Sequence, residues 1–254
     1  MFPFELLSAL WFAALAVAAI TMRHRPDARQ ALLLSAAFVV LILLTRFMAS
    51  ATIRMWAGHL YLVAAYRIPA LLATGAPGTW FEEWLVRSDA GWRPYVSRFP
   101  AWLAHVCEVA YLLCYPLVPI AFVVVWTRGD TSDVNRFWMA VLGAGFVCYG
   151  ALPWLVSRPP RLASGEGGQV RGVARVNVLV LNRVSHQLNT FPSGHVAVSV
   201  ASAVSLWSFS PGTAAVIGAI ALGVSVGAVT GRYHYVVDVI AGAAVGVLTA
   251  LVVS

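Results

Sequence analysis

The carboxy-terminal stretch of the chain, residues 193–254, reads SGHVAVSVASAVSLWSFSPGTAAVIGAIALGVSVGAVTGRYHYVVDVIAGAAVGVLTALVVS. Only two of these residues, Arg232 and Asp238, are charged at neutral pH. The stretch divides into apolar runs that are close to the roughly 20 residues a helix needs to cross a bilayer. These predicted spans are Pro192–Phe209, Gly212–Thr230 and Tyr235–Val253. The end of the chain therefore predicts three consecutive transmembrane helices.

The composition of the whole chain points the same way. Of its 254 residues, 60% are hydrophobic and 11% are charged, and the mean hydropathy is +0.80. Soluble domains carry about 25% charged residues, and disordered chains are polar and poor in aromatic residues. Both classes are excluded. We expect a single integral membrane domain over residues 1–254, folded as an all-α, polytopic membrane helix bundle.

The net charge of +7 comes from seventeen arginines, no lysine and ten acidic residues. Because the arginines lie between apolar runs, the positive charge fits a lipid bilayer with anionic headgroups better than nucleic acid, and no nucleic-acid partner is expected. The three cysteines, Cys107, Cys114 and Cys148, lie in apolar runs without paired spacing. We expect them to be core residues.

Four further apolar runs bring the expected number of transmembrane helices to about seven. They are Phe4–Thr21, Ala31–Ser50, Trp102–Trp126 and Phe137–Val156. Residues 51–100 instead mix arginines with tryptophans and tyrosines, as segments at the membrane interface do. We expect this segment to lie at the interface. The alternative is a crossing at Trp56–Ala73, which would carry His59 and Arg67 through lipid.

Loop charge gives an expected orientation. With seven spans, two short arginine-bearing loops, Met22–Arg29 and Thr127–Arg136, share one side, and the positive-inside rule makes that side cytoplasmic. The amino terminus is then outside and the carboxy terminus inside. The polar segments 51–100 and 157–191 and the junction Thr230–His234 all face outward, in what we expect to be a bacterial plasma membrane.

One pair of polar residues near the end of the chain has the spacing of a catalytic pair. If the chain is helical from Tyr233 onward, His234 and Asp238 are four residues apart on one face. The carboxylate can then accept a hydrogen bond from one imidazole nitrogen and fix the tautomer of the other. A satisfied His–Asp pair at the membrane interface, without catalytic function, is the alternative interpretation.

A second polar element begins the span before. Pro192, Ser193, Gly194 and His195 stand where a polar loop becomes an apolar run, which predicts a helix start. Free N–H groups at such a start can bind an anion, and the helix dipole favours it. His195 would stand beside that anion, although an ordinary helix start would have the same sequence.

The two elements together resemble the type 2 phosphatidic acid phosphatase superfamily of membrane lipid phosphatases. They read Phe-Pro-Ser-Gly-His at 191–195 and Gly-Arg-Tyr-His-Tyr-Val-Val-Asp at 231–238. The resemblance covers roughly residues 31–254, a six-span phosphatase-like core with an outward segment after its first span. Residues 1–30 would be an additional N-terminal span. The resemblance implies that His195, His234 and Asp238 are catalytic.

The sequence also departs from the family pattern. Of the first motif, K-x6-R-P, only Arg158 and Pro159 are present, and alanine stands in place of the lysine. The Ser-Arg that usually opens the third motif is Gly-Ala, and Arg232 is the nearest arginine. These departures and Pro-Pro-Arg at 159–161 resemble the inositol phosphorylceramide synthase branch. The residues that the resemblance implies in substrate phosphate binding are Arg158, Arg161, Ser193, Gly194 and Arg232.

The expected activity is hydrolysis of a membrane lipid phosphate through a phosphohistidine. In this mechanism His234 is the nucleophile, Asp238 orients it, and His195 protonates the leaving oxygen. A phosphotransferase that moves a phospho-headgroup between lipids is the second hypothesis. A transporter or lipid-binding protein is the third, although transporters usually carry mid-bilayer charges and internal repeats, and no repeat is found here.

No cofactor and no metal site are expected, because the one carboxylate near the histidines is already committed to His234. A soluble vanadium-dependent haloperoxidase shares similar motifs, but the hydropathy and the absence of lysine argue against it. The sequence makes no prediction about the oligomeric state.

Overall fold

The computed structural model describes residues 1–73, 80–96, 98–163, 173–184 and 187–253. Within these ranges every regular element is an α-helix and no strand forms, which confirms the all-α class. In chain order the helices are α1 (Pro3–Thr21), α2 (Ala28–Met48), α3 (Ala51–Trp56), α4 (Gly58–Leu72), α5 (Trp80–Ala90), α6 (Arg93–Val96), α7 (Ala101–Leu112), α8 (Cys114–Arg128), α9 (Thr131–Gly150), α10 (Pro160–Ala163), α11 (Val173–Val184), α12 (Gly194–Ser205), α13 (Pro211–Thr230) and α14 (Val236–Val252).

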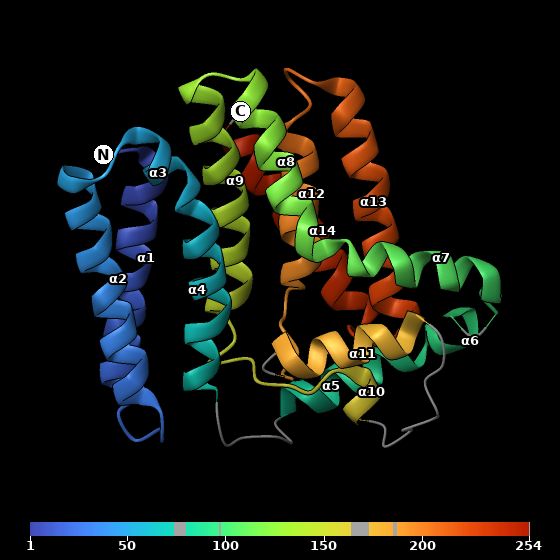
Figure 1. Ribbon diagram of the computed structural model, residues 1–254. Coiled ribbons are helices and arrows are strands. Elements are labelled where there is room, and N and C mark those ends of the chain that lie inside the picture. The colour runs from blue at the N-terminus through green and yellow to red at the C-terminus, as the bar shows by residue number, and fades with distance from the viewer. Residues whose placement is uncertain (74–79, 97, 164–172, 185–186, 254) are drawn as a thin grey trace.

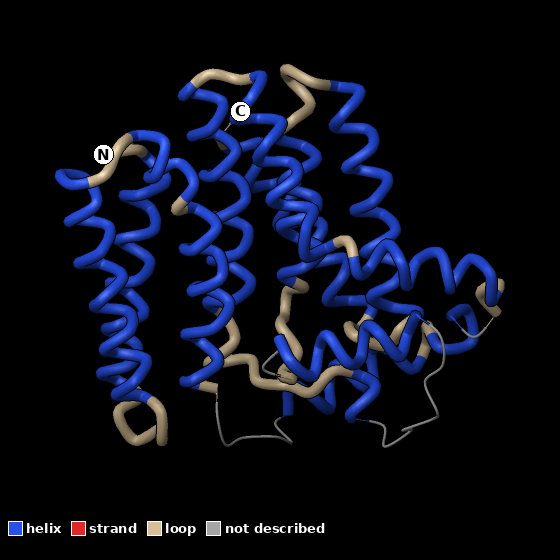
Figure 2. The backbone as a smooth tube through the Cα atoms, viewed as in Figure 1, coloured by secondary structure: helices blue, strands red, loops and turns tan. Residues whose placement is uncertain are grey.

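The longer helices stand side by side in one bundle (Figure 1). Helices α9, α12 and α14 pack against one another at its centre, and α13 packs against α7 and α12. The short helices α5, α10 and α11 lie across one end, drawn at the bottom and here called the lower end. Figure 2 shows that the loops gather at this lower end and at the opposite, upper end.

Three described helices, α1, α2 and α13, are long and apolar enough to cross a membrane. Helices α7 and α8 pass the same test together as one bent pair, which raises the number to four. Helices α12 and α14 are apolar but shorter, with 12 and 17 residues. Length and composition therefore support three or four spans among the described residues, and the seven spans predicted above stay a prediction.

The expected span Trp102–Trp126 is broken in the middle. Helix α7 ends at Leu112, helix α8 begins at Cys114, and the two axes are bent by 58°. The cause is Pro116, because a proline ring clashes with the carbonyl four residues before it and has no N–H to donate there. In the first turn of α8 the same proline is tolerated. The break leaves α7 lying crosswise, above α11 in the view of Figure 1.

The expectation that all of residues 51–100 lie at the interface is wrong for the part that contains α4. Helix α4 packs along α9, α2 and α1 and stands in the bundle, as the alternative crossing required. His59 is accommodated among aromatic rings, with centroids 5.0 Å from Phe122 and 4.8 Å from Trp138. Arg67 remains exposed beside the ring of Tyr66. Helix α5, by contrast, does lie across the lower end.

Because α4 stands in the bundle, the predicted arrangement of loops and termini is also wrong. Phe4 packs on Trp138 near the start of α9, and Trp11 stacks on Phe146 further along, so α1 runs parallel to α9. The loop Met22–Arg29 is therefore at the lower end, whereas the loop at Thr127–Arg136 is at the upper end (Figure 1). Both termini lie at the upper end, which an odd number of crossings, such as the predicted seven, does not produce.

The charge of the loops therefore no longer indicates an orientation in the membrane. The arginines of the first loop, at positions 23, 25 and 29, share the lower end with α5, α10 and α11. Only the second of the two short loops remains at the upper end. The positive-inside rule no longer favours an outward-facing lower end, since it counts positive charge in short loops.

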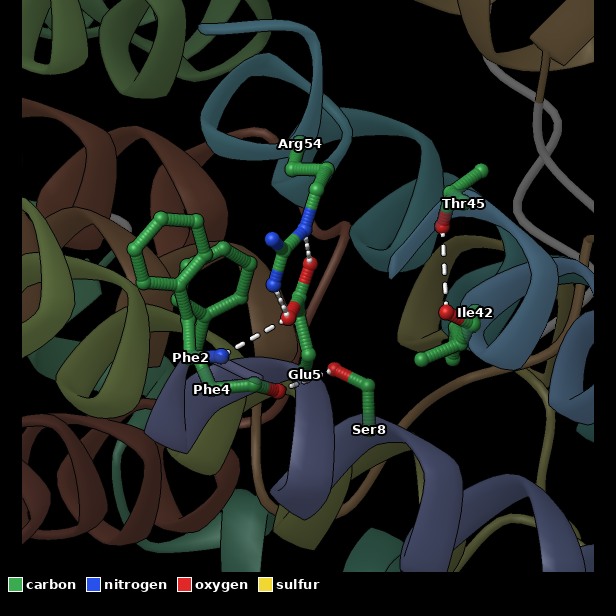
Figure 3. A network of polar contacts seen from close by, with 7 residues as sticks. All are labelled: Phe2, Phe4, Glu5, Ser8, Ile42, Thr45 and Arg54. Atoms are coloured by element: carbon green, nitrogen blue, oxygen red, sulfur yellow. Dashed lines mark hydrogen bonds and ion pairs between the residues drawn. The ribbon is translucent and has the colours of Figure 1, made fainter. Parts of the chain in front are cut away.

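A buried ion pair at the upper end ties α1 to the segment before α4 (Figure 3). The Glu5 carboxylate is fully buried and accepts a hydrogen bond from Nε of Arg54 at 2.7 Å and from the backbone N–H of Phe2 at 2.7 Å. The Arg54 guanidinium also lies 4.5 Å above the Phe2 ring. Removing one partner of a buried pair leaves an uncompensated charge, so this contact fixes the α1–α2 hairpin to the bundle.

Candidate active site

The two motifs meet at the lower end because α12 and α14 approach each other closely. A Cβ atom on Gly242 would lie 2.5 Å from the Ser193 carbonyl oxygen, and one on Gly246 would lie 2.5 Å from that of Ala197. Only glycine allows such contact between backbones. The Ser193 N–H also donates to the Asp238 carbonyl at 2.9 Å. The start of α12 is thus fixed beside the first turn of α14.

His234 lies in the turn that connects α13 to α14. Its backbone N–H, like that of Tyr233, donates to the Ala228 carbonyl at the end of α13. The condition that the chain be helical from Tyr233 onward is therefore not met, because α14 begins only at Val236. His234 is nevertheless close to Asp238. Asp238 is in the first turn of α14, and its Oδ2 accepts a hydrogen bond from the Tyr235 N–H at 2.9 Å.

Asp238 and the two histidines come together as predicted. Asp238 is fully buried, and its Oδ2 lies 3.5 Å from Nδ1 of His234, which is itself 6% exposed. The His234 ring lies 6.0 Å from the ring of His195, measured between centroids. The carboxylate therefore stands behind one histidine, leaving Nε2 of that ring as its available nitrogen.

Both histidines line one small cavity of about 20 Å³, here called the histidine pocket. Its walls come from α4, α7, α12, the segments on either side of α11, and the turn before α14. The lining residues are Tyr66, Tyr111, Pro159, Arg161, Gln187, Leu188, Thr190, His195, Tyr233 and His234. A cavity at the end of a bundle, with two imidazoles and a guanidinium in its wall, has the chemistry of an anion-binding site.

Of the three arginines predicted to bind phosphate, only Arg161 lines the histidine pocket. Its backbone N–H donates to the Arg232 carbonyl at 3.1 Å, and its guanidinium lies 5.6 Å from the centroid of the Tyr233 ring. The backbone and the aromatic ring together hold its charge beside His234.

Arg158 lies outside the pocket lining and is paired with Glu82 of α5. Its Nη2 donates to Oε1 of Glu82 at 2.6 Å, and its backbone N–H donates to Oε2 at 2.8 Å. Burial works against ionisation of this carboxyl, but the hydrogen bonds and charge of Arg158 outweigh it and hold the pKa of Glu82 below its usual value. Arg232 lines a neighbouring cleft instead.

Ser193 and Gly194, the other two predicted phosphate ligands, lie at the start of α12 and do not line the histidine pocket either. Ser193 is fully buried. The Gly194 N–H donates to the Thr190 hydroxyl at 3.3 Å, and a Cβ atom at this glycine would meet the Tyr149 ring at 2.1 Å. In this structure both residues hold the end of α12 against its neighbours, and their role in phosphate binding stays a prediction.

A buried carboxylate that the sequence did not predict lies next to the site. Glu108 of α7 is 7% exposed and accepts a hydrogen bond from the Tyr233 hydroxyl at 2.9 Å. The Asn177 amide of α11 donates to both the Glu108 carbonyl and its carboxylate. The ring of Tyr111 stacks on the ring of Tyr233, with 4.5 Å between the two centroids. A lone acidic residue within the apolar run 102–126 was the available signal.

A family model described as the PAP2 superfamily matches residues 79–252, which is more than half of the chain. The chain belongs to the PAP2 superfamily. The match confirms the resemblance derived from the two motifs, and with the apolar helices it makes this chain a membrane protein. PAP2 members are phosphatases and phosphotransferases. No curated protein and no solved structure matches the chain. The PAP2 match begins after α4, so it leaves out Tyr66 in the pocket wall.

We expect this PAP2 site to work without a metal ion, and this expectation can be tested directly. Added EDTA should leave the rate unchanged, because the Asp238 carboxylate faces His234 and octahedral magnesium sites need carboxylates or substrate phosphates with waters. The measurement is turnover of a lipid phosphate after dialysis against EDTA. Loss of activity that magnesium restores would contradict the expectation.

Proposed function

We propose that this PAP2 protein is an integral membrane lipid phosphate phosphatase that works through a phosphohistidine. The observation that carries the proposal is the position of His234. It lines one pocket with His195 and Arg161, and a buried carboxylate, that of Asp238, lies 3.5 Å behind its ring. A nucleophile oriented by a third group, with a second histidine across the pocket, is the arrangement that nucleophilic catalysis needs.

In the first step Nε2 of His234 attacks the phosphorus of the lipid phosphate. The N–P bond forms while the P–O bond to the leaving group breaks, and protonated His195 donates its proton to the leaving oxygen. Asp238 stabilises the positive charge that develops on the His234 ring. Arg161 neutralises charge on the phosphoryl oxygens, which is the main electrostatic task in phosphoryl transfer.

In the second step a water molecule attacks the phosphohistidine. His195, now neutral, accepts the proton of that water, the N–P bond breaks, and inorganic phosphate leaves. Both histidines are then in their starting protonation states.

Transfer to an alcohol is the second candidate function, and one observation favours it. Arg161 belongs to the Pro-Pro-Arg segment that resembles the synthase branch, and it lines the pocket while Arg158 of the phosphatase motif is engaged by Glu82. An acceptor hydroxyl would then replace water in the second step. A polar site at one end of the bundle does not favour a transporter.

The purified protein, assayed against a panel of lipid phosphates with and without polyol acceptors, tests both functions. Release of free phosphate that added alcohols do not change would support hydrolysis. A new phosphate monoester of the added alcohol, formed at the expense of free phosphate, would support transfer. Turnover of no lipid phosphate would overturn both.

The arginine assignment can be tested by matched substitutions. Arg161→Gln should lower kcat/KM roughly 10- to 100-fold, since a hydrogen bond to a charged group contributes about 1.5–3 kcal/mol. Arg158→Gln should act mainly on the midpoint of thermal unfolding, because it leaves the buried Glu82 carboxylate unpaired. The exposed Arg87 of α5, changed to glutamine, serves as the control for both measurements. A larger loss of kcat/KM in Arg158→Gln than in Arg161→Gln would reverse the assignment.

We propose an extracytoplasmic location for the site, and this proposal rests on the resemblance alone, since loop charge no longer favours it. In whole cells, an impermeant maleimide should label Ala90→Cys of α5 at the lower end and not Asp130→Cys at the upper end. The native cysteines, Cys107, Cys114 and Cys148, are buried and give a low background. Labelling of position 130 alone would place the site inside, and labelling of both would contradict the bundle.

A further inference from the structure

Glu108 carries a buried charge that the proposed mechanism does not use. Its side chain, on α7, is 7% exposed, and within the described residues it forms no ion pair. Its partners are neutral instead: the Tyr233 hydroxyl donates to Oε2 at 2.9 Å, and the Asn177 amide of α11 donates to the same oxygen. Burying a carboxylate costs free energy unless hydrogen bonds compensate it, so the charge depends on these two donors. Of the two, Tyr233 lines the histidine pocket.

The ring of Tyr233 is fixed by its surroundings. It stacks on the Tyr111 ring with an interplanar angle of 19°. The ring and Oε1 of Glu108 both lie against the backbone at Gly231, where a Cβ atom would be 2.3 Å from the ring and 2.6 Å from that oxygen. Burial and the Glu108 carboxylate both raise the pKa of the Tyr233 phenol, so the hydroxyl keeps the proton that it donates. The carboxylate therefore fixes the ring together with its hydroxyl.

The Tyr233 ring in turn contacts the guanidinium of Arg161. The guanidinium carbon lies 5.6 Å from the ring centroid, within the range of about 6 Å for a cation–π contact. The buried Nε of Arg161 has no hydrogen-bond partner among the residues that the structure describes. The aromatic ring is thus a main side-chain contact of this guanidinium, and both residues line the histidine pocket.

We propose that Glu108 is a positioning residue for phosphate binding, acting through Tyr233 to hold Arg161 in the wall of the histidine pocket. This inference rests on the proposed function, in which Arg161 neutralises the phosphoryl oxygens. A hydrogen bond to a charged acceptor is roughly twice as strong as one between neutral groups, so the carboxylate holds the Tyr233 hydroxyl more firmly than a neutral acceptor would. Tyr233 also directly precedes His234, and the backbone N–H groups of both donate to the Ala228 carbonyl. The same contact therefore keeps Arg161 beside the nucleophile.

The test measures the binding of methylphosphonate by calorimetry, in full-length protein reconstituted in nanodiscs. Glu108→Ala removes the acceptor and should weaken binding about tenfold. Glu108→Gln keeps an oxygen acceptor and should recover part of that affinity. In protein that already carries Arg161→Gln, Glu108→Ala should weaken binding no further, because Glu108 acts through the arginine. Glu83→Gln, which changes an exposed acid of α5, is the control and should bind as wild type does.

Weakening by the same factor with and without Arg161 would overturn the positioning role, since a residue that only supports the fold acts independently of the arginine. If Glu108→Ala does not fold, Tyr233→Phe takes its place in the same comparison, because it removes the hydroxyl and keeps the ring.

The same measurements separate this inference from the proposed function. A wild-type protein that turns over no lipid phosphate, but whose phosphonate binding depends on Glu108 only when Arg161 is present, would overturn the proposed function and support the positioning role. Turnover of a lipid phosphate, together with equal weakening in both backgrounds, would support the proposed function and overturn the positioning role.

Discussion

His234→Ala is expected to reduce turnover to the background rate. The substitution removes the attacking nitrogen, so no phosphoenzyme can form, and the loss should exceed the roughly 10²–10⁴-fold typical of general acid–base groups. His195→Ala is expected to behave differently, because it removes only the proton donor. With a substrate whose leaving group needs no proton, this variant should still form the phosphoenzyme and then hydrolyse it slowly.

The measurement is the trapping of radiolabelled phosphate on protein quenched in base, since phosphohistidine is stable in base and labile in acid. Label on His195→Ala and none on His234→Ala is the expected result. The exposed His24→Ala at the lower end is the matched control and should behave as wild type. Label on His234→Ala with none on His195→Ala would exchange the roles of the two histidines.

Asp238→Asn is expected to lower kcat roughly 10³–10⁴-fold while leaving the fold intact. Asparagine has nearly the same shape but no charge, so it removes the charge that stabilises the developing imidazolium. The oxygen that faces Nδ1 of His234 also accepts the Tyr235 N–H; an amide N–H₂ in its place would be a donor toward both groups and would force the proton to Nε2, the nitrogen that has to attack. Replacement of an orienting carboxylate by asparagine in a catalytic triad has an effect of about 10⁴ for this reason.

The comparison that isolates this effect uses kcat, KM and the unfolding midpoint together. The expected pattern is a large fall in kcat with small changes in the other two quantities. Asp133→Asn changes a carboxylate at the upper end, where it accepts the backbone N–H of Asp130, the N-cap of α9, and is the control for loss of charge. A kcat within tenfold of wild type would show that Asp238 does not orient the nucleophile.

The sequence was sufficient to predict that His234 and Asp238 lie close together. The separation of His234 and Asp238 by four residues brings them together even though His234 is not in the helix, because a turn and a first helical turn also close that distance. The meeting with His195 depended on the resemblance. Nothing in the periodicity of 192–209 reveals that α12 contacts α14 through two glycines.

Contacts between residues far apart in the sequence could not be predicted, for a physical reason. Arg158 and Glu82 are 76 positions apart, and a single sequence carries no signal for which buried carboxylate meets which arginine. The expectation that the segment containing α4 lies at the membrane interface was wrong for another reason. From composition alone, His59 and Arg67 disfavour a crossing of the bilayer. In the structure, aromatic rings surround His59, and Arg67 is exposed beside Tyr66. Pro116, by contrast, was a readable signal for the break between α7 and α8.

The ion pair between Glu5 and Arg54 also constrains the order in which the protein can assemble. Synthesis delivers the carboxylate first, and its partner emerges only after the whole of α2. During that interval the Glu5 carboxylate lacks its cationic partner. The hairpin can therefore be fixed to the bundle only after α3, which contains Arg54, and the start of α4 have been made. A chain that began at residue 31, where the family core was expected to start, would release Arg54 from this lock and leave α4 and α9 without the helix that covers them. The α1–α2 hairpin is thus made first, and the chain fixes it to the rest of the bundle only when Arg54 has been synthesised and pairs with Glu5.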